Sequence, residues 1–130
     1  MNDVFEIPTG SRVFLGAPTN SISQDAVNLL RNLVSNEPGV IEAHIPQCYI
    51  PSMMTEPHQV LFVICSSRGS VDRSVTSLTK HLAKAILLDG IIDIFPLTVT
   101  HELVRAVRGA GCQIYQQKGS PDEVSVNQIV

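Results

Sequence analysis

The sequence predicts an α+β domain with ferredoxin-like topology, a split β-α-β sandwich with an added C-terminal helix and strand. Residues 22–33 and 71–88 carry apolar side chains at the spacing of amphipathic helices, while 40–45 and 60–65 carry the patterns of strands. Over residues 12–95 the predicted order is β-α-β-β-α-β, which is the ferredoxin-like order. The chain of 130 residues suits one domain. We expect residues 1–116 to form it, with 117–130 as a tail that is either loose or a docking arm.

The first half of the chain predicts a strand, a helix and a second strand. Residues 12–16 read RVFLG, a short strand, and 17–20 form a turn. Ser21 is expected to cap the helix, with Gln24 completing a capping box, and Pro38 ends it because proline cannot continue the hydrogen-bond ladder. Residues 40–45 read VIEAHI. Alternation predicts that one set of side chains faces the core and that the other, which holds Glu42 and His44, faces water.

The second half begins with a loop over residues 51–59, and the apolar run VLFVIC at 60–65 predicts a strand buried on both faces. A helix over 71–88 ends at Gly90, and a strand over 91–95 ends at Pro96. Thr100 is expected to cap a short helix over 101–108, before a last strand over 112–116. One sheet face stays open unless the third helix, the tail or a partner covers it. The predicted core consists of Leu15, Leu30, Leu33, Ile41, Leu61, Val63, Leu78, Leu82, Ile94 and Leu103.

Composition disfavours several classes of partner. Charged residues make up 16% of the chain, the net charge is −3, and Lys and Arg are scattered, so nucleic acids and anionic membranes are not expected to bind. The N-terminus lacks the pattern of a signal peptide, and no apolar run is long enough to span a bilayer. The three cysteines include no CxxC pair, which fits a reducing compartment. We therefore expect a cytoplasmic protein.

Several phrases of the sequence carry a family resemblance. They are FEIPTGSRVFLGAP, PGVIEAHIPQ, EPHQVLFVI, IDIFPL and HELVRAVRGAGCQIYQQ, which together extend from about Phe5 to Gln116. In these phrases the chain resembles the C-terminal domain of the SseB family, the bacterial enhanced serine sensitivity proteins. The resemblance implies an intracellular, non-enzymatic domain. It implies no substrate and no site residues.

Candidates for catalysis or metal binding are weak. His44, Cys48, His58 and Cys65 are the densest group of soft ligands, but their spacing matches no zinc signature. Cys48 precedes no predicted helix that would lower the pKa of its thiol, so an inert thiol is favoured over a nucleophile. The nucleophile-elbow, dinucleotide and P-loop motifs are absent. The sequence therefore predicts no enzyme, no metal site and no cofactor.

The turn between residues 65 and 71 is the best candidate for a small ligand. It places Ser67, Arg68 and Ser70 where free backbone N–H groups at a helix start would attract an anion. A simple helix cap explains the same residues and is favoured. The alternative function is a domain that senses an amino acid or another small anion. It rests on ferredoxin-like amino-acid-binding domains, which share the predicted topology, and on the family name, which refers to serine.

The short helix near the C-terminus is the best candidate for a protein contact. His101, Arg105 and Arg108 share one face of it by the three-and-four rule. A solvated face whose charges match the helix dipole explains them as well and is favoured, but arginine is also enriched at protein interfaces. With the low charge and the incompletely covered sheet, they predict a non-catalytic interaction or regulatory domain whose partner is a second copy or another chain.

Overall fold

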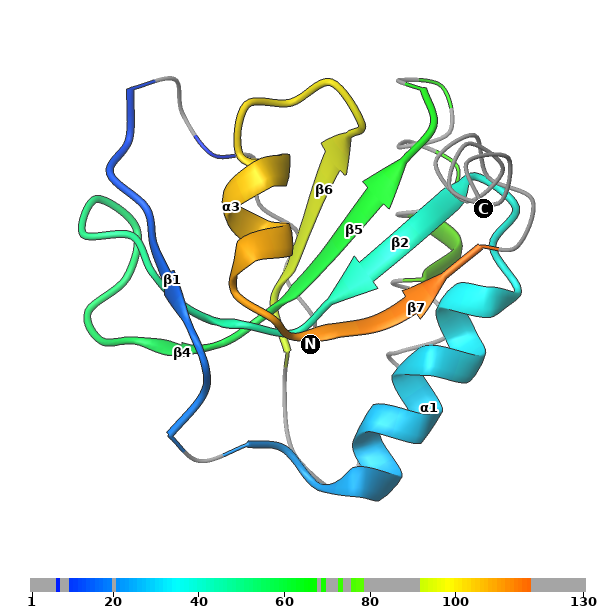
Figure 1. The fold of residues 1–130 in the computed structure, drawn as a ribbon, viewed down its shortest axis with the longest axis horizontal. Helices are drawn as coiled ribbons and strands as arrows, with labels where there is room; N and C mark the ends of the chain where they lie inside the picture. The colour runs from blue at the N-terminus through cyan, green and yellow to red at the C-terminus, as the bar shows by residue number, and fades with distance from the viewer. Residues whose placement is uncertain are drawn as a thin grey trace, which may run out of the picture.

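The computed structural model describes residues 7, 10–19, 21–67, 69, 73, 76–78 and 92–117. These residues form a mixed α+β structure, as predicted (Figure 1). The elements are β1 (Phe14–Gly16), α1 (Gln24–Ser35), β2 (Val40–His44), β3 (Gln47–Tyr49), β4 (His58–Gln59), β5 (Leu61–Cys65), β6 (Ile94–Thr98), α3 (Val104–Gly109) and β7 (Gln113–Gln116). Within the predicted helix over 71–88, residues 73 and 76–78 are helical, and its remaining residues, Leu82 included, lie outside the described part.

The strands form two sheets. The larger has the order β6-β5-β2-β7, in which β5 and β6 are parallel and β2 is antiparallel to both β5 and β7. The smaller has the order β1-β3-β4 and is antiparallel throughout. A parallel pair such as β5 and β6 requires a crossover, and the helical residues around Leu78 lie within that connection.

The ferredoxin-like strand order is not observed. That order would place the first strand between the strands predicted at 60–65 and 91–95, but β5 and β6 pair directly, from Leu61 with Ile94 to Cys65 with Thr98. β1 pairs with β3 instead, in register from Phe14 with Tyr49 to Gly16 with Gln47. β7, expected as an addition, is an edge strand of the larger sheet. The order of elements was therefore insufficient to predict the pairing.

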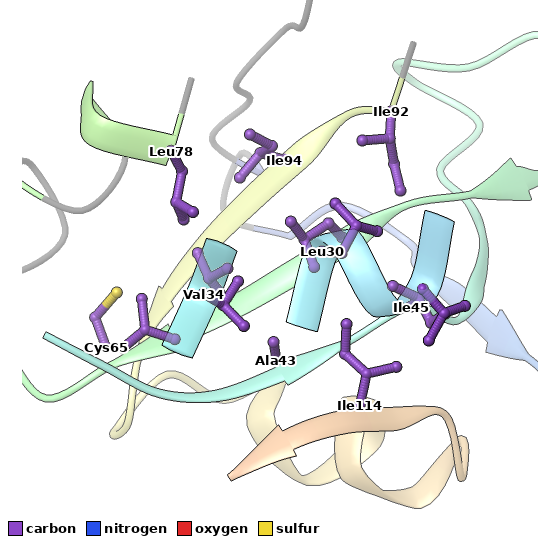
Figure 2. Close-up of a cluster of buried hydrophobic side chains, with 13 residues drawn as sticks. Leu30, Val34, Ala43, Ile45, Cys65, Leu78, Ile92, Ile94 and Ile114 are labelled. Atoms are coloured by element: carbon purple, nitrogen blue, oxygen red, sulfur yellow. The ribbon is translucent and has the colours of Figure 1, made fainter. Parts of the chain in front are cut away.

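One core cluster lies between the larger sheet, α1 and the helical residue Leu78, and Figure 2 shows Leu30 and Val34 of α1 among the side chains of the sheet. Val27, Leu30 and Val34 are buried at the spacing expected for an amphipathic helix. The cap prediction was wrong by two residues. Ser23, not Ser21, precedes the helix, and its hydroxyl accepts a hydrogen bond from the backbone N–H of Ala26 at 3.1 Å.

A second core cluster covers the other face of the larger sheet, where α3 and Cys48 of β3 pack against Phe62, Ile64 and Phe95. The face that the sequence left open is therefore covered within the chain. Glu42 and His44, expected to face water, are 4% and 1% exposed. The pairing of β2 with β5 shifts between Val40 and Glu42, which fits a β-bulge. The bulge explains why Ile41 belongs to this second cluster while Ala43 belongs to the first.

Two other boundaries differ from the prediction. Pro96 does not end its strand, because β6 is an edge strand and a proline there need not donate a hydrogen bond to a further strand. The C-terminal helix begins at Val104 rather than after Thr100, and no side chain caps it. Of the predicted core, Leu30, Ile41, Leu61, Val63, Leu78 and Ile94 are buried. Leu15, Leu33 and Leu103 are partly buried against the clusters.

Candidate functional site

A depression of about 500 Å³ lies beside α3. It is lined by Val99, His101, Glu102, Val104, Arg105 and Arg108, and we call it the α3 depression. All three residues predicted for a protein contact are among these. Val99 is 36% exposed, one of two large apolar side chains that are exposed in the described part of the chain. The depression therefore combines an exposed apolar side chain with two guanidinium groups.

The turn before α3 positions His101. Its backbone N–H donates to the carbonyl oxygen of Thr98 at 2.9 Å. Its ring atom Nδ1 accepts a hydrogen bond from the backbone N–H of Leu103 at 3.1 Å, which requires that Nδ1 carries no proton. The imidazole thus satisfies a backbone donor at the entry to the helix while its ring borders the depression.

The guanidinium group of Arg108 binds the carboxylate of Glu42, which lies on β2 of the larger sheet. Its Nε donates to Oε1 and Oε2 of Glu42 at 3.0 and 3.1 Å, and its Nη2 also donates to Oε2. The Glu42 side chain is 5% exposed and that of Arg108 is 41% exposed. The pair therefore joins α3 to the middle of β2 with one end buried and the other at the surface.

A histidine completes this network. The Nε2 of His44 lies 2.9 Å from Oε1 of Glu42, and the side chain of His44 is 1% exposed. The other ring nitrogen, Nδ1, is buried and has no hydrogen-bond partner among the residues that the structure describes. A neutral ring that donates from Nε2 fits this geometry, because a proton on Nδ1 would be buried without an acceptor.

The network shifts the pKa values of both buried groups. Burial by itself raises the pKa of Glu42, but the hydrogen bonds and charge of Arg108, with those of His44, outweigh it and hold the pKa below its ordinary value. Burial lowers the pKa of His44, and the positive charge of Arg108 acts in the same direction, against the opposing effect of Glu42. Glu42 is therefore charged and His44 neutral near neutral pH.

These shifts predict a dependence of stability on pH. Because the folded-state pKa of His44 is below 6.5, the unfolded chain binds more protons as the pH falls through that value. The stabilising contribution is complete above about pH 6.5 and is lost as the pH falls towards the folded-state pKa. Urea denaturation at pH 7.5, 6.5 and 5.5 should show a decline that is smaller in His44→Gln. An equal decline in both proteins would contradict this assignment.

Three of the four candidate metal ligands, His44, Cys48 and Cys65, are buried. Among the described residues there is no group of three or more side chains placed to bind a metal ion. Cys48 and Cys65 are fully buried, and burial raises the pKa of their thiols to about 12 and about 11. His58 lies opposite Cys48 across the small sheet, but its Nε2 contacts Oδ2 of Asp93 at 2.8 Å. Thiols of this kind are poor nucleophiles because the thiolate is scarce.

The candidate anion turn can be placed only in part. Ser67 is exposed at the end of β5, whereas Arg68 and Ser70 lie outside the described residues. The structure therefore neither brings these three together nor separates them.

Sequence reasoning missed the role of Glu42 and His44. The alternation in β2 suggested a face exposed to water, and the separation of 66 positions between Glu42 and Arg108 conceals the pairing. One available signal was the neighbouring run at 60–65, which is entirely apolar. A strand that pairs with such a run lies against the same buried layers, so charged side chains on it require partners from elsewhere in the fold.

No family model, curated protein or solved structure matches this chain. Among the described residues, no helix is both long enough and apolar enough to cross a bilayer.

Proposed function

We propose that this protein is a non-catalytic, cytoplasmic interaction domain that binds a protein partner through the α3 depression. The observation that carries the proposal is the convergence of Val99, Arg105 and Arg108 on one surface feature. Protein interfaces combine apolar contact with arginine more often than the rest of a protein surface does. The resemblance to the C-terminal domain of the SseB family implies an intracellular domain without catalysis, which is compatible with this proposal.

The hydrogen bonds of Arg108 favour binding at this surface. Glu42 holds the guanidinium group from behind with a bidentate contact. A side chain that is ordered before binding loses less conformational entropy when a partner arrives. Arg105 is exposed, so it is the charged side chain that a partner would meet at the rim.

The cysteines support a role without catalysis. The thiols of Cys48 and Cys65 have raised pKa values, and both lie within the hydrophobic core. In the polar network of Glu42, His44 and Arg108, the carboxylate of Glu42 is buried and the guanidinium group of Arg108 reaches the surface. Such a network suits the positioning of a contact residue.

The test compares how much of a specific partner each variant recovers when one surface residue is replaced by glutamate. Val99→Glu and Arg105→Glu should each lower the recovery of a specific partner from the native cell by about tenfold, as expected for a central contact. Asn32→Glu, on the exposed face of α1, is the matched control and should recover as much partner as the wild type. Light scattering after size exclusion identifies a partner that is a second copy of the chain. Equal recovery with all four proteins would contradict the proposal.

A second candidate function is the sensing of a small molecule. The volume of the α3 depression, about 500 Å³, is within the range of small-molecule sites, and Arg105 could pair with an anionic group. Thermal shift measurements with serine, aspartate and phosphate separate the two functions, because a ligand of the folded state raises the melting temperature. A rise that Arg105→Glu abolishes would favour sensing over protein binding.

A further inference from the structure

Three polar groups connect the interior of the larger sheet with the α3 depression. The side chains of His44 and Glu42 are 1% and 5% exposed, whereas that of Arg108 is 41% exposed and lines the depression. The atom Oε1 of Glu42 lies 2.9 Å from Nε2 of His44 and 3.0 Å from Nε of Arg108. One carboxylate oxygen therefore joins a buried imidazole to a guanidinium group at the surface.

The surroundings of the His44 imidazole accommodate one proton. Its Nε2 donates to Glu42, and its Nδ1 is buried without a hydrogen-bond partner among the described residues. A second proton, on Nδ1, would create a buried N–H group without an acceptor and a positive charge beside the carboxylate. The three groups, which together are neutral when His44 carries one proton, would then carry one excess positive charge.

The strands beside His44 contribute no charge to its surroundings in the described part of the chain. Phe62 of β5 and Gln113 of β7 are in register with it. The second core cluster covers the same face of the sheet, and its one titratable side chain among the described residues is that of Cys48. Burial raises the pKa of this thiol to about 12, so it stays neutral where an imidazole titrates.

On the side of α3, the charged and titratable groups that line the depression are His101, Glu102, Arg105 and Arg108. Arg108 binds Glu42, so a proton gained by His44 acts on the shared carboxylate and through it on Arg108. Two cations at one carboxylate repel each other. Arg108 is the most exposed of the three groups in the network, so it is the group that can move.

We propose that His44 is a buried proton switch for the α3 depression, in which a proton gained in mild acid weakens the contact of Arg108 with Glu42 and shifts the guanidinium group at the surface. The effect on a partner rests on the proposed function, whereas the switch itself requires only the network of the three groups. Because the pKa of His44 lies below its ordinary value, the contact is intact at neutral pH and weakens below about pH 6.5. Glu42 stays ionised over this range because Arg108 and His44 hold its pKa below the ordinary value.

The test is an NMR titration of the full chain from pH 7.5 to pH 5 that follows the ring of His44 and the Nε–Hε group of Arg108. Both resonances should shift with one common midpoint, while the backbone resonances of β5 keep the dispersion of the folded state. Because coupling between two sites is reciprocal, Arg108→Gln should make His44 take up its proton at a higher pH. Separate midpoints, an unchanged midpoint of His44 in Arg108→Gln, or unfolding before either group shifts would each overturn the proposal.

Two histidine variants identify the group that takes up the proton. In His44→Gln the side-chain amide can still donate to Glu42 but does not titrate, so the resonance of Arg108 should not shift over this range. His101→Gln is the matched control, because His101 lines the same depression and its protonation would place a charge beside Arg108 directly. This control should keep the wild-type shift, and a shift that persists in His44→Gln but disappears in His101→Gln would contradict the assignment.

These measurements require no partner. An absence of partner binding at the α3 depression would contradict the proposed function but would leave the shared midpoint of His44 and Arg108 in place. The comparison of midpoints in the wild type and in Arg108→Gln also does not depend on whether His44→Gln folds.

Discussion

Replacing Phe62 with alanine should lower the free energy of unfolding by about 3–5 kcal/mol, the range for a large aromatic side chain removed from a core. Phe62 is the second residue of β5, a central strand, and is fully buried. Its ring stacks with that of Phe95 on the neighbouring strand, with centroids 5.3 Å apart. β5 is paired on both sides, with β6 and with β2, so the backbone can collapse only partly into the cavity.

Urea denaturation at neutral pH measures this loss, and Phe14→Ala is the matched control. Phe14 is half exposed on the small sheet, so its truncation should cost about 1 kcal/mol or less, mainly through the lost contact with Tyr49. A cost below about 1 kcal/mol for Phe62→Ala would mean that β5 is not the centre of the core.

Replacing Glu42 with glutamine should lower the free energy of unfolding by about 2–3 kcal/mol. The change leaves the shape of the side chain but removes the charge that Arg108 and His44 share. Breaking a buried ion pair typically costs about 3–5 kcal/mol, and we expect less here because Arg108 is 41% exposed and can turn towards water. The exposed neighbour Glu102 provides the control, and Glu102→Gln should stay within about 0.5 kcal/mol of the wild type.

A double-mutant cycle isolates the interaction itself. Arg108→Gln alone leaves the Glu42 carboxylate buried with one fewer partner, so it should also destabilise the fold. The double variant should cost clearly less than the sum of the two single variants, because each single change already breaks the pair. Simple additivity would show that Glu42 and Arg108 do not stabilise each other.

Several elements could be predicted from local patterns alone. The run at 60–65 is entirely apolar, and β5 is buried along its whole length. A helix was likewise predicted from the apolar spacing of residues 22–33, and α1 covers residues 24–35. Of the residues that defined that spacing only Leu30 is buried, and Val27 and Val34 complete the buried face. These predictions were accurate because the period of apolar side chains depends only on local backbone geometry.

The candidate site was predictable only in part. Helical spacing placed His101, Arg105 and Arg108 on one face, and all three line the α3 depression. The partner of Arg108 was not predictable, because no local pattern links residues that are 66 positions apart. The same limit hid the contact between Phe14 and Tyr49, which meet only through strand pairing.

The sequence by itself determined which segments are apolar, where they alternate and where the chain turns. Only the tertiary structure decided that β1 pairs with β3 in the smaller sheet and not with the strands of the larger one. It also decided that α3 covers the second face of the larger sheet and that Glu42 and His44 are buried. The physical reason is that each local segment has several pairings of similar quality. The choice among them depends on which arrangement buries the most apolar surface while giving every buried charge a partner.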